Sequence, residues 1–131
     1  MRNVGFITKN KFFEGFKKIL IKNGFNVYDG KNEYRELNLL IIEYFKNENY
    51  DNILNKYPGK IAFFDFDEQM IFEKIKDKRI LAVINNGKYK EMTCKVLNIK
   101  EINSEINYIR MVKYVKMAIG FCNGKVVDNN A

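Results

Sequence analysis

The sequence predicts an α/β fold with a doubly wound, five-stranded parallel sheet. Strand-like and helix-like segments alternate along the chain, and the clearest strands are short apolar runs of the kind that a parallel sheet buries on both faces. A length of 131 residues with 47% hydrophobic composition suits a single domain with its own core. We expect this domain to span residues 1–124, and residues 125–131 to form a polar tail or the start of an interdomain linker.

The opening stretch "NVGFITKNKFFEGFKKIL" changes its period halfway. Residues 4–8 form a compact apolar run that predicts a buried strand, and apolar residues then recur at helical spacing at Phe12, Phe13, Phe16, Ile19 and Leu20. Asn10 is placed to cap this helix, and Asn23 with Gly24 to end it. The alternating segment "FNVYDG" predicts a second strand and a turn. Because such folds keep functional groups at the carboxyl ends of strands, the junction "TKNK" is a candidate site.

The middle of the chain is predicted to continue the alternation. Residues 32–49 are expected to be a helix because five apolar side chains share one helical face: Tyr34, Leu37, Leu40, Ile41 and Tyr44. The single proline precedes "IAFFDFD", which predicts a central strand. A short helix over 68–77 and a buried strand in "RILAVINNG" follow.

The last third is predicted to contain two more helices. We expect one over 89–97, a weak strand over 98–105, and a long helix over 106–121 that ends at Asn123 and Gly124. In that long helix, four residues are spaced to face the sheet: Val112, Val115, Ile119 and Cys122.

Composition narrows the classes of function. The chain has no His, which removes the commonest proton-transfer group, the Ser-His and Cys-His nucleophile pairs and most zinc sites. Cys94 and Cys122 form no CxxC pair, no apolar run reaches the length of a membrane span, and the N-terminus lacks a signal-peptide core. We therefore expect a cytoplasmic protein that is not an enzyme and uses no cofactor or metal. The net charge of +7 permits an anionic partner, although the lysines are spread along the whole chain.

The opening segment resembles the start of a response-regulator receiver domain, of the LuxR/NarL-type subgroup that precedes a helix-turn-helix. "VGFITKNKFFEGFKKIL" aligns without a gap on that subgroup's opening pattern, matching at Phe12, Glu14, Gly15, Phe16 and Leu20. "VKMAIGFCNGKVV" is similar to the close of the family's last helix. The resemblance implies a flavodoxin-like, CheY-like fold and a role in two-component signal transduction and transcription regulation.

The resemblance also implies a degenerate phosphorylation pocket. Ile7 and Thr8 stand where receivers have the paired aspartates that hold Mg²⁺, and Ile cannot ligate that cation. Ile84 and Asn85 stand where the family has a Ser or Thr at the end of the fourth strand, and Lys100 is the only nearby candidate for the lysine that ends the fifth.

The phospho-acceptor position has two candidates. If "KIAFFDFD" is the third strand, the acceptor position is Asp65; if "YDNILN" is the third strand, it is Asn55. The first is favoured because residues 61–64 make the better buried strand. Either group would be a poor acceptor without a metal site.

The function predicted is an atypical, phosphorylation-independent receiver domain that acts through dimerisation or partner docking. In receivers, the last helix contributes to the dimer face, which here would include Tyr108, Arg110, Met111, Lys113 and Phe121. DNA would be contacted only through a further C-terminal domain. The alternatives are a basic nucleic-acid-binding module and a flavodoxin-like binder of small ligands.

Overall fold

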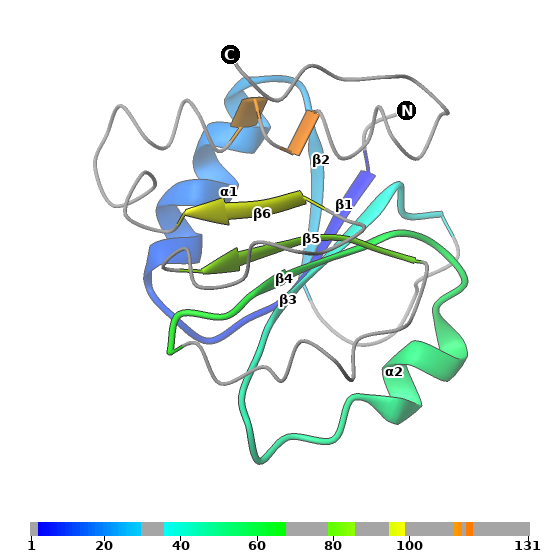
Figure 1. The fold of residues 1–131 in the computed structure, drawn as a ribbon. Helices are drawn as coiled ribbons and strands as arrows, with labels where there is room; N and C mark the ends of the chain where they lie inside the picture. The colour runs from blue at the N-terminus through cyan, green and yellow to red at the C-terminus, as the bar shows by residue number, and fades with distance from the viewer. Residues whose placement is uncertain are drawn as a thin grey trace.

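Six strands form one parallel sheet in the order β2-β1-β3-β4-β5-β6 (Figure 1). The computed structural model describes residues 3–29, 36–67, 79–85, 95–98, 112–113 and 115–116. The strands are β1 (Asn3–Ile7), β2 (Asn26–Asp29), β3 (Leu39–Glu43), β4 (Ile61–Phe64), β5 (Ile80–Asn85) and β6 (Lys95–Asn98). The helices are α1 (Phe12–Lys22) and α2 (Asp51–Lys56), and residues 112–113 and 115–116 are also helical.

Every strand pair in this sheet is parallel, which confirms the predicted α/β class. β1 pairs with β2 on one side and with β3 on the other, so Val4 lies between Val27 and Leu39. The predicted number of strands, five, is too low, because the described residues alone form six strands of this sheet.

Helix α1 covers one face of the sheet. Three side chains of α1 are fully buried: Phe13, Phe16 and Leu20. They pack against strand side chains on this face, which every second residue of a strand supplies. The aromatic ring of Phe64 in β4 lies 5.0 Å from that of Phe13, centroid to centroid. Val112 and Val115 are buried in the same cluster, which confirms that the described part of the last helix faces the core.

Helix α2 lies on the opposite face, and none of its own residues is fully buried. Leu40, Ile42 and Ile61 are fully buried there, together with Tyr57, which follows α2 directly. The guanidinium of Arg79 donates hydrogen bonds to the main-chain carbonyls of Leu54 and Tyr57, so it satisfies carbonyl groups that the end of α2 leaves unpaired. This contact ties the end of α2 to the start of β5.

The N-terminal unit agrees closely with the prediction. β1 and α1 occupy the expected segments. The N-cap residue of α1 is Lys11 rather than the predicted Asn10, but Asn10 Oδ1 accepts a hydrogen bond from the main-chain N–H of Phe12 at 2.9 Å. Asn23 is the C-cap residue that directly follows α1, and Gly24 comes next with φ 84°, a left-handed conformation that glycine adopts without a steric cost.

The helix predicted over 32–49 is wrong where the structure describes it. Residues 39–43 form strand β3, and all five of its residues are buried. "LLII" is apolar at consecutive positions, so it suits a strand that is covered on both faces, between β1 and β4. Apolar residues match helical spacing from Tyr34 to Tyr44 only because residues 39–42 are all apolar, and a continuous apolar run fits a helix or a strand.

The strand "IAFF" is present, but it is the fourth strand rather than the third. The alternative third strand, "YDNILN", is also wrong, because residues 51–56 form α2. Asn55 therefore lies in a helix and not at a strand end.

The predicted helix over 89–97 is wrong at its carboxyl end, where residues 95–97 belong to β6 and pair with β5. β5 itself lies within the predicted "RILAVINNG" strand. The expected helix over 68–77, the two cysteines and the tail at 125–131 lie outside the described residues.

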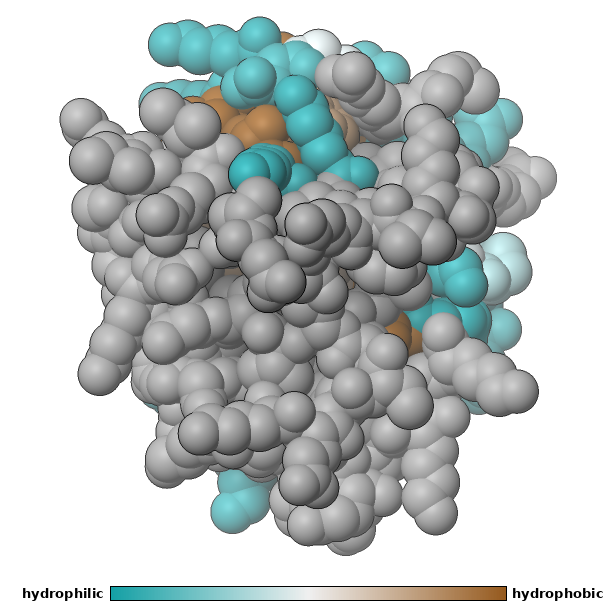
Figure 2. All heavy atoms as spheres, turned by 45° about the horizontal axis from the view of Figure 1, so that its top comes forward, coloured by the Kyte–Doolittle hydropathy of each residue, from teal (hydrophilic) through white to brown (hydrophobic). Residues whose placement is uncertain are grey.

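On the face drawn in Figure 2, the described part of the surface is mainly hydrophilic. In the view of Figure 2, teal residues surround only small brown areas where described residues reach the surface. Among the described residues, the large hydrophobic side chains that are exposed are Ile21 and Tyr28. Single exposed apolar residues of this kind are ordinary on a globular domain.

Candidate functional site

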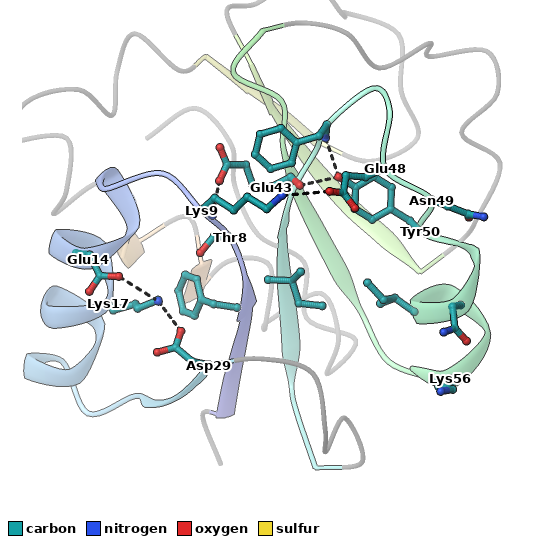
Figure 3. Close-up of a pocket in the computed structure, with 15 residues that line it drawn as sticks. Thr8, Lys9, Glu14, Lys17, Asp29, Glu43, Glu48, Asn49, Tyr50 and Lys56 are labelled. Carbon is teal, nitrogen blue, oxygen red and sulfur yellow. Dashed lines mark hydrogen bonds and ion pairs between the residues drawn. The ribbon is translucent and has the colours of Figure 1, made fainter.

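A pocket of about 780 Å³ lies at the carboxyl ends of β1 and β3 (Figure 3). From β1 the chain runs through α1 to β2 on one side, while from β3 it runs through α2 to β4 on the other side. Where connections diverge in this way, a crevice remains outside the strand ends, and open α/β sheets bind their ligands there. Both the position and the volume of this pocket are typical of a small-molecule site.

Glu43 is the central acid of the pocket. It is the last residue of β3 and only 5% exposed. Its Oε1 accepts hydrogen bonds from the main-chain N–H groups of Lys9 (2.7 Å) and Asn10 (2.9 Å), which lie between β1 and α1. Backbone donors close to a helix N-terminus stabilise a carboxylate. Glu43 therefore joins the end of β3 to the loop that follows β1.

Tyr50 holds the segment that follows β3. Its hydroxyl donates a hydrogen bond to the carbonyl of Glu43 (2.9 Å) and accepts one from the N–H of Phe45 (2.7 Å). Its ring stacks on that of Tyr44 at 5.5 Å between centroids. Burial raises the pKa of the Tyr50 phenol from 10.0 to about 12, so it keeps its proton and donates at neutral pH.

Lys9 lies at the upper rim of the pocket as drawn in Figure 3. Its ammonium is 3.1 Å from Glu48 Oε1 and 5.0 Å from the ring centroid of Phe45. The Lys9 side chain is 71% exposed and that of Glu48 is 50% exposed. An ion pair exposed to this extent contributes little to folding stability, but it sets the charge around Lys9 close to neutral.

Lys17 forms the side of the pocket that comes from α1 and β2. Its ammonium pairs with Glu14, at 3.6 Å, and with Asp29 at the end of β2. The Lys17 side chain is only 13% exposed, and its ammonium lies 5.4 Å from the ring centroid of Phe6. Two carboxylates thus share one partly buried cation, which leaves this side with a net negative charge.

The opposite side of the pocket comes from α2 and the segment before it. Asn49 Oδ1 accepts a hydrogen bond from the N–H of Asp51 (2.9 Å) at the start of α2. Ile53 adds an apolar surface, and Lys56 lies at the end of the helix. Within the part of the chain that the structure describes, no ion pair or hydrogen bond engages the Lys56 ammonium.

Ile7 and Thr8 both line this pocket, as predicted for the strand-end position. Ile7 is the last residue of β1 and packs against the core on the α2 face, and Thr8 follows it with a half-buried side chain. The predicted site at the end of β1 therefore coincides with a real hollow in the structure.

Asp65 does not share the pocket. It directly follows β4 and is fully buried, but it is not among the residues that line this hollow. The acid that ends the third strand is Glu43, so the assignment of Asp65 to the third strand's end is wrong for the reason given above.

Only some of the remaining predicted residues lie within the described parts of the chain. Ile84 and Asn85 end β5, next to the end of β4, and Lys100 lies outside the described residues. Of the predicted dimer face, Lys113 is described and is exposed. The other four members of that face lie outside the described residues: Tyr108, Arg110, Met111 and Phe121.

Glu43, Lys17 and Tyr50 were not predicted as site residues. A signal for Glu43 exists in the sequence, because "LLIIE" repeats the pattern of "IAFFD", a run of four apolar residues that ends in an acid. Lys17 lies one helical turn after Glu14 on α1, but its second partner, Asp29, is twelve residues further along the chain, and only the fold brings the two together.

The described residues include neither a metal-binding cluster nor a membrane-spanning helix. Among them, no group of three or more His, Cys, Asp or Glu side chains is arranged to hold a metal ion. None of the helices described is both long and apolar enough to cross a membrane.

No protein-family model matches this chain, and no curated protein or solved structure shows significant similarity to it. A function for this chain therefore has to be inferred from its own residues and from the geometry of the pocket.

Proposed function

We propose that this chain is a receiver-like signalling domain of the cytoplasm that works without phosphorylation, through self-association or docking to a partner. The strand order β2-β1-β3-β4-β5 supports a flavodoxin-like topology, with β6 as an additional edge strand. The similarity of residues 4–20 to the opening of receiver domains supports the same assignment.

The observation that carries the proposal is that Glu43 ends the third strand and already accepts main-chain hydrogen bonds. In the receiver pattern, the phospho-acceptor aspartate ends the third strand beside two acids that follow the first strand. Here the third strand ends in Glu43, and Ile7 and Thr8 stand at the end of the first. One oxygen of Glu43 already accepts two main-chain hydrogen bonds, so this carboxylate acts as a structural link between β1 and β3.

The absence of phosphoryl transfer is tested with acetyl phosphate and Mg²⁺. We expect no gain in intact mass and no change in oligomeric state, because a phosphoryl acceptor needs nearby metal-held charge to stabilise the transition state. The measurement is intact-protein mass spectrometry together with light scattering after size exclusion. A mass increase of one phosphoryl group on Glu43 or Asp65 would contradict the proposal.

Self-association is tested by reversing the charge of Lys113. We expect Lys113→Glu to weaken the homodimer by about tenfold, roughly 1.4 kcal/mol, because a change at a two-fold interface occurs twice. Lys56→Glu is the matched control, since Lys56 ends α2 on the opposite face of the sheet from Val112 and Val115. Sedimentation equilibrium over a concentration series gives both dissociation constants. A parent chain that stays monomeric, or equal losses in the two variants, would contradict a dimer through the last helix.

A further inference from the structure

The pocket between α1 and α2 has opposite charge on its two sides. In Figure 3, Glu14, Lys17 and Asp29 lie together on one side, and Asn49, Tyr50 and Lys56 lie on the other. Among the described residues on the first side, the exposed carboxylates of Glu14 and Asp29 outnumber the ammonium of Lys17. The first side therefore attracts a cation.

The second side attracts an anion. Lys56 lines it with an ammonium that is engaged in no ion pair or hydrogen bond within the described residues. Asn52, which precedes Lys56 by one helical turn, also lines the pocket and adds an amide group that can donate a hydrogen bond. An ammonium and an amide on one helix face suit a carboxylate.

The other charged groups of the pocket are already neutralised or engaged. Lys9 pairs with Glu48 at the rim, and the Glu43 carboxylate accepts two main-chain hydrogen bonds. Between the two charged sides the lining includes apolar side chains, among them Ile7, Phe45 and Ile53. A bound molecule would therefore meet charge at its two ends and apolar surface along its middle.

From this arrangement we propose that the pocket binds a zwitterionic small molecule with an ammonium at one end, a carboxylate at the other and an apolar body between them. The ammonium lies against Glu14 and Asp29, and the carboxylate lies against Lys56. Among the described lining residues, a simple anion such as phosphate meets four carboxylates and three ammonium groups, so it gains no net attraction from them. The volume of about 780 Å³ accommodates a molecule as large as a short peptide.

In the proposed signalling domain, this ligand would be the input that replaces phosphorylation. Only that role depends on the proposed function, because binding itself depends on the pocket alone. A ligand that bridges α1 and α2 would stabilise one arrangement of the two helices on their opposite faces of the sheet.

Binding is tested on the full chain with a series of unbranched ω-amino acids of increasing length, followed by isothermal titration calorimetry. The alkylamine and the alkanoate of the same length are the single-charge controls. We expect at least one ω-amino acid to bind about tenfold more tightly than both of its controls, because only the zwitterion satisfies both sides of the pocket.

Two variants locate the ends of the ligand. Lys56→Met should remove the advantage of the zwitterion over the alkylamine, and Asp29→Asn should reduce its advantage over the alkanoate. Lys22→Met, at the exposed end of α1 and outside the pocket lining, is the matched control and should leave all affinities unchanged. Circular dichroism melting of each variant establishes that the fold is retained.

Equal affinity for the zwitterion and either control, or no binding by any member of the series, would overturn the proposal. So would a loss of affinity in Lys22→Met as large as that in Lys56→Met. Phosphorylation by acetyl phosphate with zwitterion binding intact would refute the proposed function and leave this inference standing. If the chain takes up no phosphoryl group and binds no zwitterion, this inference is refuted and the proposed function stands.

Discussion

Replacement of Glu43 by alanine is expected to lower the free energy of unfolding by about 2–4 kcal/mol. Glu43 is nearly buried, and its carboxylate is the acceptor for the main-chain N–H groups of Lys9 and Asn10. Alanine would leave both donors without this acceptor and would remove the link between β1 and β3. Urea unfolding followed by circular dichroism gives the change directly.

The isosteric variant Glu43→Gln distinguishes the contribution of the two hydrogen bonds to stability from that of the negative charge. Glutamine keeps one carbonyl oxygen where Oε1 lies, so its cost should be about 1 kcal/mol, the loss of charge assistance in the two bonds. Glu48→Gln is the surface control, because its ion pair with Lys9 is exposed and its loss should cost less than about 1 kcal/mol. If Glu43→Ala were no more destabilising than Glu48→Gln, Glu43 would not be the structural link proposed here.

The N-terminal unit could be predicted from local signals because they agree with one another. The apolar run of β1, the helical spacing of α1 and the Asn23-Gly24 stop all indicate the same elements, and Gly24 has the positive φ that such a stop requires. No distant part of the chain has to be known to place these residues.

β3 could not be predicted in this way because its signal is ambiguous. "LLII" fits a strand covered on both faces, but with its apolar neighbours it also fits one side of a helix. The deciding factor is pairing with β1 and β4, which lie more than thirty residues before and about twenty residues after it. The same holds for β6, which is defined by its pairing with β5.

The wrong prediction of a helix at residues 39–43 also affected the predicted site. Because the sequence predicts a helix over residues 39–43, it does not mark Glu43 as a strand-end acid, and it assigns Asp65 to that position instead. The sequence nevertheless predicts a site at the end of β1, and Ile7 and Thr8 both line the candidate pocket. The paired charges of Lys17 depend on the contact between α1 and β2, which local sequence patterns do not encode.

Introducing acids at the end of β1 is expected to have the largest effect on the pocket. The double variant Ile7→Asp, Thr8→Asp should lower the free energy of unfolding by about 3 kcal/mol or more. Ile7 packs against the core on the α2 face, so its replacement removes apolar contacts and brings a charge into a partly buried place. The new carboxylates would also share a pocket with Glu43, and like charges in one site repel each other.

Mg²⁺ should restore part of that stability, because three carboxylates around one pocket supply the oxygen ligands that the cation requires. A cation present at about 100 times its dissociation constant stabilises the folded state by about 2.7 kcal/mol. Ile7→Asn, Thr8→Asn is the matched control: it loses the same apolar contacts, adds no charge, and should melt at the same temperature with and without Mg²⁺. Thermal melting of parent, acidic variant and amide variant in a Mg²⁺ titration makes the comparison. A parent chain that already gains several degrees from millimolar Mg²⁺ would mean that the unmodified pocket assembles a cation site, and the phosphorylation-independent function would have to be abandoned.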